Sequence, residues 1–261
     1  MSAAAQLLQQ RSFGQLKLHV DACGPQLIRE VGASKLRLPR GSHEAIFINT
    51  GGGLAGGDFF EHEFSCAENS ELTLTTQAAE RVYQTLGPPA IIRTQMNVGP
   101  SSTLMWIPHE TILYDGASLE RNFIVSLDKN SKFLGVEPVV FGRTEMGEQI
   151  SQIHLKDRWR INREGTPIHA DDFSVGPKLP STISTLASAK AFATVIYVAA
   201  DATDQLEAVR AAMNKNDGAS AWNGKLIARL VANDGFLLRK ALIPVLNVLA
   251  GSVALPKIWT A

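Results

Sequence analysis

The stretch AIIRTQMNVGPSSTLMWI, residues 90–107, decides the fold class. Over residues 90–98, apolar and polar side chains alternate, as they do in a strand that buries one face. A second apolar run, STLMWI at 102–107, follows after Gly99-Pro100, a pair typical of turns. Two short strand patterns joined by a turn predict β structure in this part of the chain.

The same pattern of short strands and turns continues on both sides of this stretch. Further strand patterns lie at 16–20, 71–76, 122–128, 133–141 and 158–162, and turn-forming residues separate them at 87–89, 115–116, 128–130 and 165–167. Many short strands at roughly even spacing predict a mainly β fold of layered or stacked sheets. We therefore expect a β-solenoid-like scaffold over about 13–173. No repeat of fixed period is visible, so a regular solenoid is not predicted.

After a loop expected at 174–188, the pattern changes from strands alone to strands and helices. The continuous apolar run at 191–200 is typical of a strand buried on both faces. Thr203 is a suitable N-cap for a helix over the following residues, DQLEAVRAAMNKN. A strand over 225–232 and an apolar helix over 236–250 complete the pattern. We expect a small C-terminal α/β lobe over about 189–261, with about two helices, within a single domain spanning 1–261.

Charge and composition exclude several function classes. The 261 residues carry 25 basic and 25 acidic side chains, so no global field attracts nucleic acid or an anionic membrane. The N-terminal residues lack the basic and apolar regions of a secretory signal, which favours a cytoplasmic location. The longest uncharged apolar run, Ala241–Leu255, is too short for a membrane span.

The loop NTGGGLAGGD, residues 49–58, contains a glycine pattern that also occurs in dinucleotide-binding loops. The residues that follow carry no sustained helical stripe, so no helix N-terminus is expected to receive a pyrophosphate. The glycines instead predict a corner between sheets. Asp58 either bonds neighbouring amides in a turn or serves as a polar group in a narrow passage.

No catalytic constellation appears in the sequence. The six histidines are scattered, no GxSxG marks a serine nucleophile, and Cys23 and Cys66 have no metal-site spacing. We therefore predict that the chain is not an enzyme. The alternative hypothesis is a β-rich hydrolase or transferase that uses paired carboxylates around Asp58.

Five segments resemble, in the same order, those of one known family. They are the Gly-Gly-Asp loop, TTQAAERVY at 75–83, MWIPHETILYDGA at 105–117, GRTEMGE at 142–148 and LPKIW at 255–259. The chain resembles urease accessory protein D (UreD, also called UreH) from about residue 13 to the C-terminus. The segment 35–40 departs from the family pattern, and 172–190 is hard to align.

The resemblance implies a non-catalytic, layered β scaffold that acts as a nickel-delivery chaperone. Family members bind apo-urease and the accessory protein UreF, and UreF recruits the GTPase UreG. The assembly inserts nickel into urease, with a water-filled passage through the D and F proteins as the proposed route. No tightly bound cofactor is implied, only transient Ni²⁺.

A passage gives carboxylates a physical task, because oxygen ligands release a borderline ion more readily than imidazole or thiolate. The candidate ligands for transient nickel are Asp58, Glu80, Glu137, Glu148 and Asp171. Glu137 interrupts an apolar strand, and an acid there needs a partner. For each acid, a structural hydrogen bond or salt bridge is the alternative interpretation.

Four residues are candidates for partner contact. In TTQAAERVY, Arg81 and Tyr83 either present a polar face to a partner or form the outward side of a strand. His109 and Glu110 follow Trp106 where a strand ends in a turn. Trp106 itself is expected in the core. The helix expected at 236–250 has a wide apolar face, which either packs on the sheet or meets UreF.

Overall fold

The computed structural model describes residues 11–143, 146–178, 186 and 189–260. The extreme N-terminus, in which no secretory signal was expected, and most of the loop expected at 174–188 lie outside these residues.

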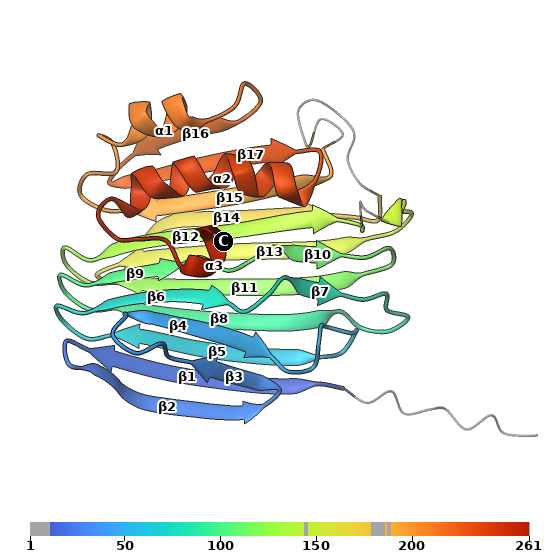
Figure 1. Ribbon diagram of the computed structural model, residues 1–261, viewed down its shortest axis with the longest axis horizontal. Coiled ribbons are helices and arrows are strands. Elements are labelled where there is room, and N and C mark those ends of the chain that lie inside the picture. Colours follow the sequence, from blue (N-terminus) through green and yellow to red (C-terminus); the bar gives the residue numbers. More distant parts are fainter. Residues whose placement is uncertain (1–10, 144–145, 179–185, 187–188, 261) are drawn as a thin grey trace, which may run out of the picture.

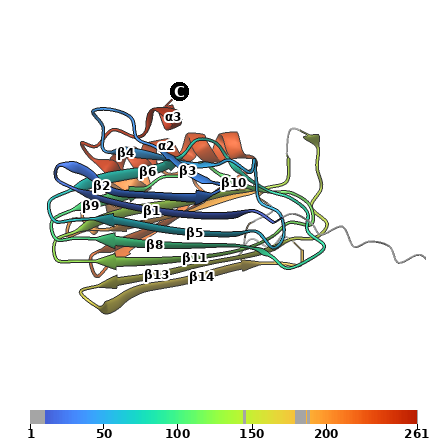
Figure 2. The ribbon, with the colours of Figure 1, turned by 90° about the horizontal axis from the view of Figure 1, so that it is seen from below.

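The described residues form two β-sheets packed face to face (Figures 1 and 2). The seven-stranded sheet has the order β14 (Thr166–Val175), β13 (His154–Arg163), β11 (Ser118–Leu127), β8 (Ala90–Val98), β5 (Phe59–Cys66), β1 (Phe13–Asp21) and β2 (Gly24–Gly32). The ten-stranded sheet has the order β16 (Gly218–Trp222), β17 (Lys225–Ala232), β15 (Ala191–Val198), β12 (Lys132–Phe141), β9 (Thr103–Trp106), β6 (Glu71–Thr76), β4 (Glu44–Asn49) and β3 (Ser34–Arg37), with β7 (Glu80–Val82) and β10 (Thr111–Leu113) beside this path.

From β4 to β13 the chain passes back and forth between the two sheets, so that successive coils stack on one another. Strands β1, β5, β8, β11 and β13 are parallel neighbours in one sheet, and β4, β6, β9 and β12 are parallel neighbours in the other. The predicted mainly β, solenoid-like scaffold is thus confirmed. The coils begin at unequal intervals, at Phe59, Ala90, Ser118 and His154, which explains why the sequence shows no fixed repeat.

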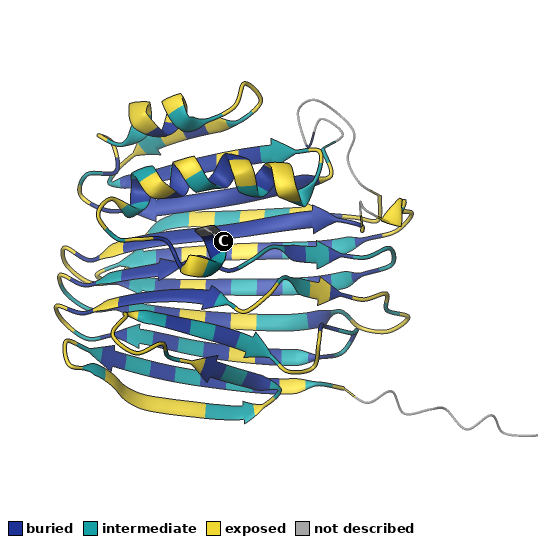
Figure 3. Ribbon diagram, viewed as in Figure 1, coloured by how far each residue is buried: buried dark blue, intermediate teal, exposed yellow. Residues whose placement is uncertain are grey.

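The core lies between the sheets, where the alternating strands bury their apolar faces (Figure 3). Phe123 of β11 stacks on Trp159 of β13 with ring centroids 4.2 Å apart. Strand β12 is buried along nearly its whole length, because it lies inside the ten-stranded sheet and both of its faces are covered. Trp106 is buried as expected.

The C-terminal part adds strands to the ten-stranded sheet and helices to one face of it. Strands β15, β17 and β16 continue it by antiparallel pairing, and α1 (Leu206–Ala212) and α2 (Gly235–Ala250) lie on its outer face (Figure 1). A third helix, α3 (Lys257–Thr260), follows α2, and β16 is a strand that the sequence pattern did not predict. None of the helices in the described residues combines the length and apolar character needed to cross a bilayer.

The two larger helices begin differently. Asp234 caps α2 by accepting a hydrogen bond from the Leu237 backbone N–H at 2.7 Å. The helix begins at Gly235, one residue before the predicted start at 236. The predicted cap at Thr203 is wrong, because α1 begins at Leu206 and is preceded by Gln205, whose side chain makes no capping bond. Residues 200–205 form turns instead, which places Thr203 before the helix.

Candidate functional site

A group of polar side chains lies inside the protein, between the two sheets. From the seven-stranded sheet, His62, Thr94, Arg121 and Asp157 point inward from four successive parallel strands. Glu137 and Thr111 face them from the ten-stranded sheet, and all six side chains are buried. Burying so many polar groups costs free energy unless each gains a partner, so their contacts define what the site can do.

Arg121 is the centre of this group. Its guanidinium donates to the carboxylates of Glu137 and Asp157, the latter at 2.5 Å, and to the Thr111 hydroxyl at 3.1 Å. The Trp106 indole N–H donates to the other Glu137 oxygen at 2.5 Å. One guanidinium therefore serves two carboxylates in a region closed to solvent.

The charges of this group do not balance. Arg121 can neutralise only one of its two acidic partners, so full ionisation would leave one buried negative charge. Burial raises the pKa of Glu137, Arg121 lowers it, and the nearby charge of Asp157 raises it again, with a net upward shift. Burial also raises the pKa of Asp157, and Arg121 again acts in the opposite direction. The cluster therefore holds either a proton or a net negative charge, which would attract a cation.

A cavity of about 40 Å³ adjoins the cluster. It is large enough for more than one water molecule. Its polar lining residues are His62, Thr76, Glu80, Thr94, His109, Thr111, Arg121 and Glu137. Several buried polar atoms here lack a hydrogen-bond partner among the described residues, namely both ring nitrogens of His62, Oγ1 of Thr94, Nε2 of His109, Nε of Arg121 and Oδ1 of Asp157.

Glu80 lines two neighbouring pockets. Together with Phe47 and Thr76, it lines both the cavity and a second pocket of about 150 Å³, which includes Gly52 and Gly53 of the glycine loop. The Asn49 amide donates to both Glu80 oxygens, at 3.2 and 3.1 Å. Burial raises the pKa of Glu80 to about 7, against the lowering effect of the bond from Asn49. Glu80 thus changes charge near neutral pH.

The glycine loop forms a packed corner, as the sequence indicated, and is followed by strand β5 rather than a helix. A Cβ atom at Gly53, whose φ is +149°, would lie 2.5 Å from the Tyr83 ring. At Gly56 it would lie 1.7 Å from the Thr85 hydroxyl oxygen. These positions exclude larger residues because other parts of the chain approach closely.

Asp58 is buried, but it does not line the interior cavity. One of its oxygens accepts the Ser12 backbone N–H at 2.7 Å, and the other accepts that of Ala55 at 2.8 Å. This geometry favours the turn role over a passage role. The alternative enzyme hypothesis expects paired carboxylates around Asp58. Among the described residues neither oxygen is hydrogen-bonded to another carboxyl group, although the charge of Asp58 is close enough to raise the pKa of Glu80.

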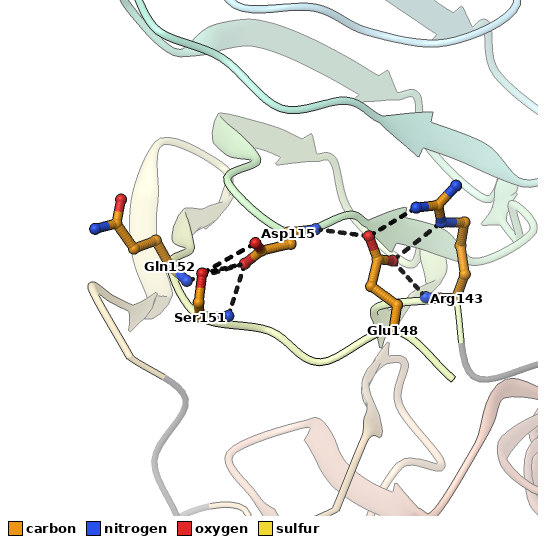
Figure 4. Close-up of polar contacts among 5 residues, drawn as sticks. All are labelled: Asp115, Arg143, Glu148, Ser151 and Gln152. Carbon is orange, nitrogen blue, oxygen red and sulfur yellow. Dashed lines mark hydrogen bonds and ion pairs between the residues drawn. The ribbon is translucent and has the colours of Figure 1, made fainter. Parts of the chain in front are cut away.

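Glu148 lies away from the cavity, on the segment after β12 (Figure 4). Its carboxylate accepts from the backbone N–H and the guanidinium of Arg143, and from the Asp115 backbone N–H. Asp115 in turn accepts from Ser151 and from the Gln152 backbone N–H. Figure 4 shows that these contacts join three chain segments, so Glu148 fixes the loop architecture here.

Asp171 lies on β14 and pairs with Arg229 of β17, an ion pair that joins the two sheets. Its charge is close enough to raise the pKa of Asp157. Among the five candidate acids, the structure therefore brings Glu80 and Glu137 to one cavity. It places Asp171 next to their cluster, and Asp58 and Glu148 in structural turns.

The four candidate contact residues divide into two pairs. Arg81 and Tyr83 are exposed, and the Tyr83 hydroxyl donates to the Gly52 carbonyl. His109, by contrast, is covered by the C-terminus: its ring stacks on Trp259, and its Nδ1 lies 2.9 Å from Nη1 of Arg239. Glu110 lies beside it, 3.8 Å from the same ring nitrogen. Within the chain, His109 is thus a cavity-wall residue rather than a free surface group.

The sequence reasoning missed five members of the site, namely His62, Thr94, Thr111, Arg121 and Asp157. Arg121 and Asp157 each lie two positions before a buried aromatic residue of the same strand, Phe123 and Trp159 respectively. Residues two positions apart in a strand point to the same face, so the aromatic residue predicts that the charged side chain is buried too. His62 carries the same signal, two positions before Phe64. No three His, Cys, Asp or Glu side chains in the described residues are grouped so that they could hold a metal ion.

Comparison with known proteins gives a consistent result. The family model described as UreD urease accessory protein matches residues 23–260. The urease accessory protein UreD of Chelativorans sp. (strain BNC1) is 39% identical over 262 residues, covering 96% of this chain and 95% of the relative. The UreD protein of Rhizobium etli is 42% identical over 246 residues, covering 90% of each chain. That of Sinorhizobium medicae is 38% identical over 276 residues and covers both chains completely.

Proposed function

Because the chain belongs to the UreD urease accessory protein family, we propose that it is an accessory protein in the maturation of urease. In this proposal the protein is not a catalyst. It is a scaffold that holds UreF, and through it the GTPase UreG, on apo-urease while nickel is inserted. Nickel is the cargo and is bound only in transit.

The observation that carries the proposal is the polar interior between the two sheets. Glu80 lines both a surface pocket at the glycine loop and the interior cavity, and Glu137 lies further inside with Arg121 and Asp157. Burying these charged and polar groups stabilises the fold less than apolar residues of similar volume would. A route for a hydrated cation explains why the cost is retained.

The electrostatics suit a divalent ion in transit. The cluster of one guanidinium and two carboxylates carries a net negative charge whenever both acids are ionised, and Glu80 adds another above a pH of about 7. Carboxylate oxygens hold nickel less tightly than thiolates, so they favour passage over storage. We assign Glu80 and Glu137 as transient ligands, and Asp171 as a neighbour that adds to the negative potential.

The surface of the protein is consistent with work in a complex. Arg81 and Tyr83 are exposed next to the pocket that Glu80 lines, and we assign them to a partner contact at that entrance. Phe236 and Leu237, at the start of α2, are exposed apolar groups on another part of the surface. Balanced charge gives no basis for binding nucleic acid, and we place the complex in the cytoplasm.

Co-expression with tagged UreF from the same organism tests the scaffold role. Affinity capture followed by size exclusion is expected to give stoichiometric co-elution. Arg81→Ala and Tyr83→Ala are expected to weaken capture, whereas Glu207→Ala, on an 83% exposed side chain of α1, is the control. A soluble, folded chain that does not co-elute would contradict the proposed assembly.

The route is tested separately, with the complex intact. Glu137→Gln keeps the shape and the bond from Trp106 but removes a charge, and we expect urease activation by the purified complex to fall severalfold. Glu207→Gln, far from the cavity, should leave activation unchanged. Full activation by Glu137→Gln combined with Glu80→Gln would show that nickel does not use this interior.

A further inference from the structure

Glu80 of β7 is a half-buried acid without a basic partner. The uncharged Asn49 amide donates to both of its oxygens, at 3.2 and 3.1 Å, and no lysine, arginine or histidine among the described residues forms an ion pair with it. The charge of Asp58 disfavours ionisation of Glu80 more strongly than the charge of Arg81 favours it. An ionised Glu80 is therefore left without a compensating positive charge, which is costly for a group partly removed from water.

The pocket of about 150 Å³ that Glu80 lines is bordered by exposed residues, among them Gly52, Gln77 and Arg81. Its volume accommodates several water molecules, and hence an ammonium or guanidinium group. The methylene stem of a lysine or arginine packs well along apolar side chains. Four such residues line the pocket, namely Phe47, Ile48, Ala78 and Ala79. The pocket thus combines an uncompensated acid with apolar walls.

Arg81 does not supply the missing positive charge itself. It follows Glu80 directly in β7, and successive side chains of a strand leave from opposite faces. Arg81 and Tyr83 are exposed beside the pocket, where the proposed partner contact lies. We propose that the pocket receives a lysine or arginine side chain of that partner, which pairs with the Glu80 carboxylate; this inference rests on the proposed function, in which a partner docks here.

The pairing predicts that partner binding depends on pH. Burial raises the pKa of Glu80 to about 7, against the lowering effect of the bond from Asn49. At that pKa, about a tenth of the Glu80 carboxyl groups is ionised at pH 6 and about nine tenths at pH 8. A partner that binds only the ionised form therefore gains about tenfold in affinity between these two pH values.

Other charged and titratable groups surround Glu80. On the pocket side they are Asp58 and Arg81, and on the side of the interior cavity they are His62, His109 with its neighbour Glu110, Arg121 and Glu137. Among these, Glu137 also has a raised pKa, because it is buried. A variant at Glu137 is therefore needed to show which of the two acids sets the pH dependence of binding.

The experiment measures the dissociation constant between the full chain and tagged UreF from the same organism at pH 6, 7 and 8. A chelator is present throughout, so that no metal ion serves as the cation. For the unsubstituted chain we expect the constant to fall about tenfold from pH 6 to pH 8. Glu80→Gln keeps the size of the side chain but not its charge, so its constant should stay near the pH 6 value of the unsubstituted chain throughout. Glu137→Gln and Glu207→Gln should retain the pH dependence.

The basic residue on the partner can be located with the same assay. Each lysine and arginine of UreF is replaced by alanine in turn, and capture is measured at pH 8. One substitution is expected to weaken binding of the unsubstituted chain about tenfold and to have little effect on binding of Glu80→Gln, because both changes remove the same ion pair.

The outcomes are distinct. If Glu80→Gln binds as tightly as the unsubstituted chain at pH 8, the inference is overturned and the proposed scaffold role stands. A pH dependence that persists in Glu80→Gln but disappears in Glu137→Gln also overturns it, because the titrating acid then lies in the interior. A folded chain that UreF does not capture at any pH contradicts the proposed function and this inference together.

Discussion

At the scale of single residues, Arg121 shows how one side chain determines the state of its neighbours. It bridges Glu137 of the opposite sheet and Asp157 of the adjacent strand, and none of the three is exposed to water. Removing the guanidinium would leave two carboxylates facing each other in a medium of low polarity. The guanidinium therefore offsets part of the free-energy cost of burying the two acids.

Arg121→Met is accordingly expected to destabilise the fold by about 3–5 kcal/mol, the typical cost of breaking a buried ion pair. Urea unfolding followed by circular dichroism measures this. Arg158→Met is the matched control, because Arg158 lies on the outward face of β13 with its side chain half exposed. Its loss should cost less than about 1 kcal/mol. Equal effects at the two positions would contradict the assigned role.

Glu80 predicts a pH dependence of stability. Its pKa is raised from 4.5 to about 7 in the folded protein. Between pH 4.5 and about 7, the carboxyl group is therefore protonated in the folded state but ionised in the unfolded state. The contribution of this proton to stability is complete below pH 4.5 and is lost as pH rises through about 7. Above that range the buried carboxylate is a net cost.

Glu80→Gln removes this titration. The quantity compared is the unfolding free energy of the variant minus that of the unsubstituted chain. We expect this difference to be about 2 kcal/mol more favourable at pH 8 than at pH 4, after allowance for the partial exposure of the carboxyl group. Denaturant unfolding at both pH values measures the difference. A variant whose relative stability is the same at pH 4 and pH 8 would show that Glu80 does not titrate in this range.

At the scale of elements, the short helix α3 closes one side of the interior. Trp259 is buried, donates its indole N–H to the Ile107 carbonyl at 3.0 Å, and stacks on His109 of the cavity wall. The Arg239 guanidinium of α2 lies 4.9 Å above the same indole. Four residues of helix are too few to be stable alone, so these contacts hold α3 in place.

Trp259→Ala is expected to cost about 3–5 kcal/mol in stability because it leaves a cavity. Trp259→Phe, which retains most of the packing, should cost about 1 kcal/mol for the lost hydrogen bond. Thermal and urea unfolding report both values. Trp222→Ala is the control, since that indole is 43% exposed on β16. If Trp259→Ala were no more costly than Trp222→Ala, α3 would not be anchored as described.

At the scale of the whole molecule, stability is expected to vary along the stack of strands. Strands β8 and β11 have parallel neighbours on both sides and lie in the middle of their sheet, whereas β2 is an edge strand with most residues exposed. Opening an edge strand exposes little apolar surface, while opening a central one disrupts the entire core.

Hydrogen exchange should therefore be slowest in β8, β11 and β12 and fastest in β2. Mass spectrometry of the exchanging full chain measures this directly. Amides of β2 that pair with β1 provide the internal comparison, because they are hydrogen-bonded yet peripheral. Protection in β2 as long-lived as in β11 would mean that β2 is covered in solution by another chain.

Local pattern alone determined much of this protein. Alternation over 90–98 and 158–162 predicted strands, the run at 191–200 predicted a buried strand, and an apolar stripe predicted α2, because each pattern reports which face of one element meets water. The helix after the glycine loop was correctly excluded on the same grounds. The cap at Thr203 failed because a capping side chain is a local preference that turns of the surrounding chain can override.

Only the tertiary structure decided which acids lie together. Glu137 and Asp157 are 20 positions apart and in different sheets, and they meet because Arg121 comes between them. Glu80 reaches their cavity from a third segment, while Asp58 and Glu148, which lie in family-like motifs, bond to the backbone instead. The alternation of residues along a strand determines which face of the strand carries a charged side chain. The stacking of the coils determines which other charged side chains lie opposite that side chain.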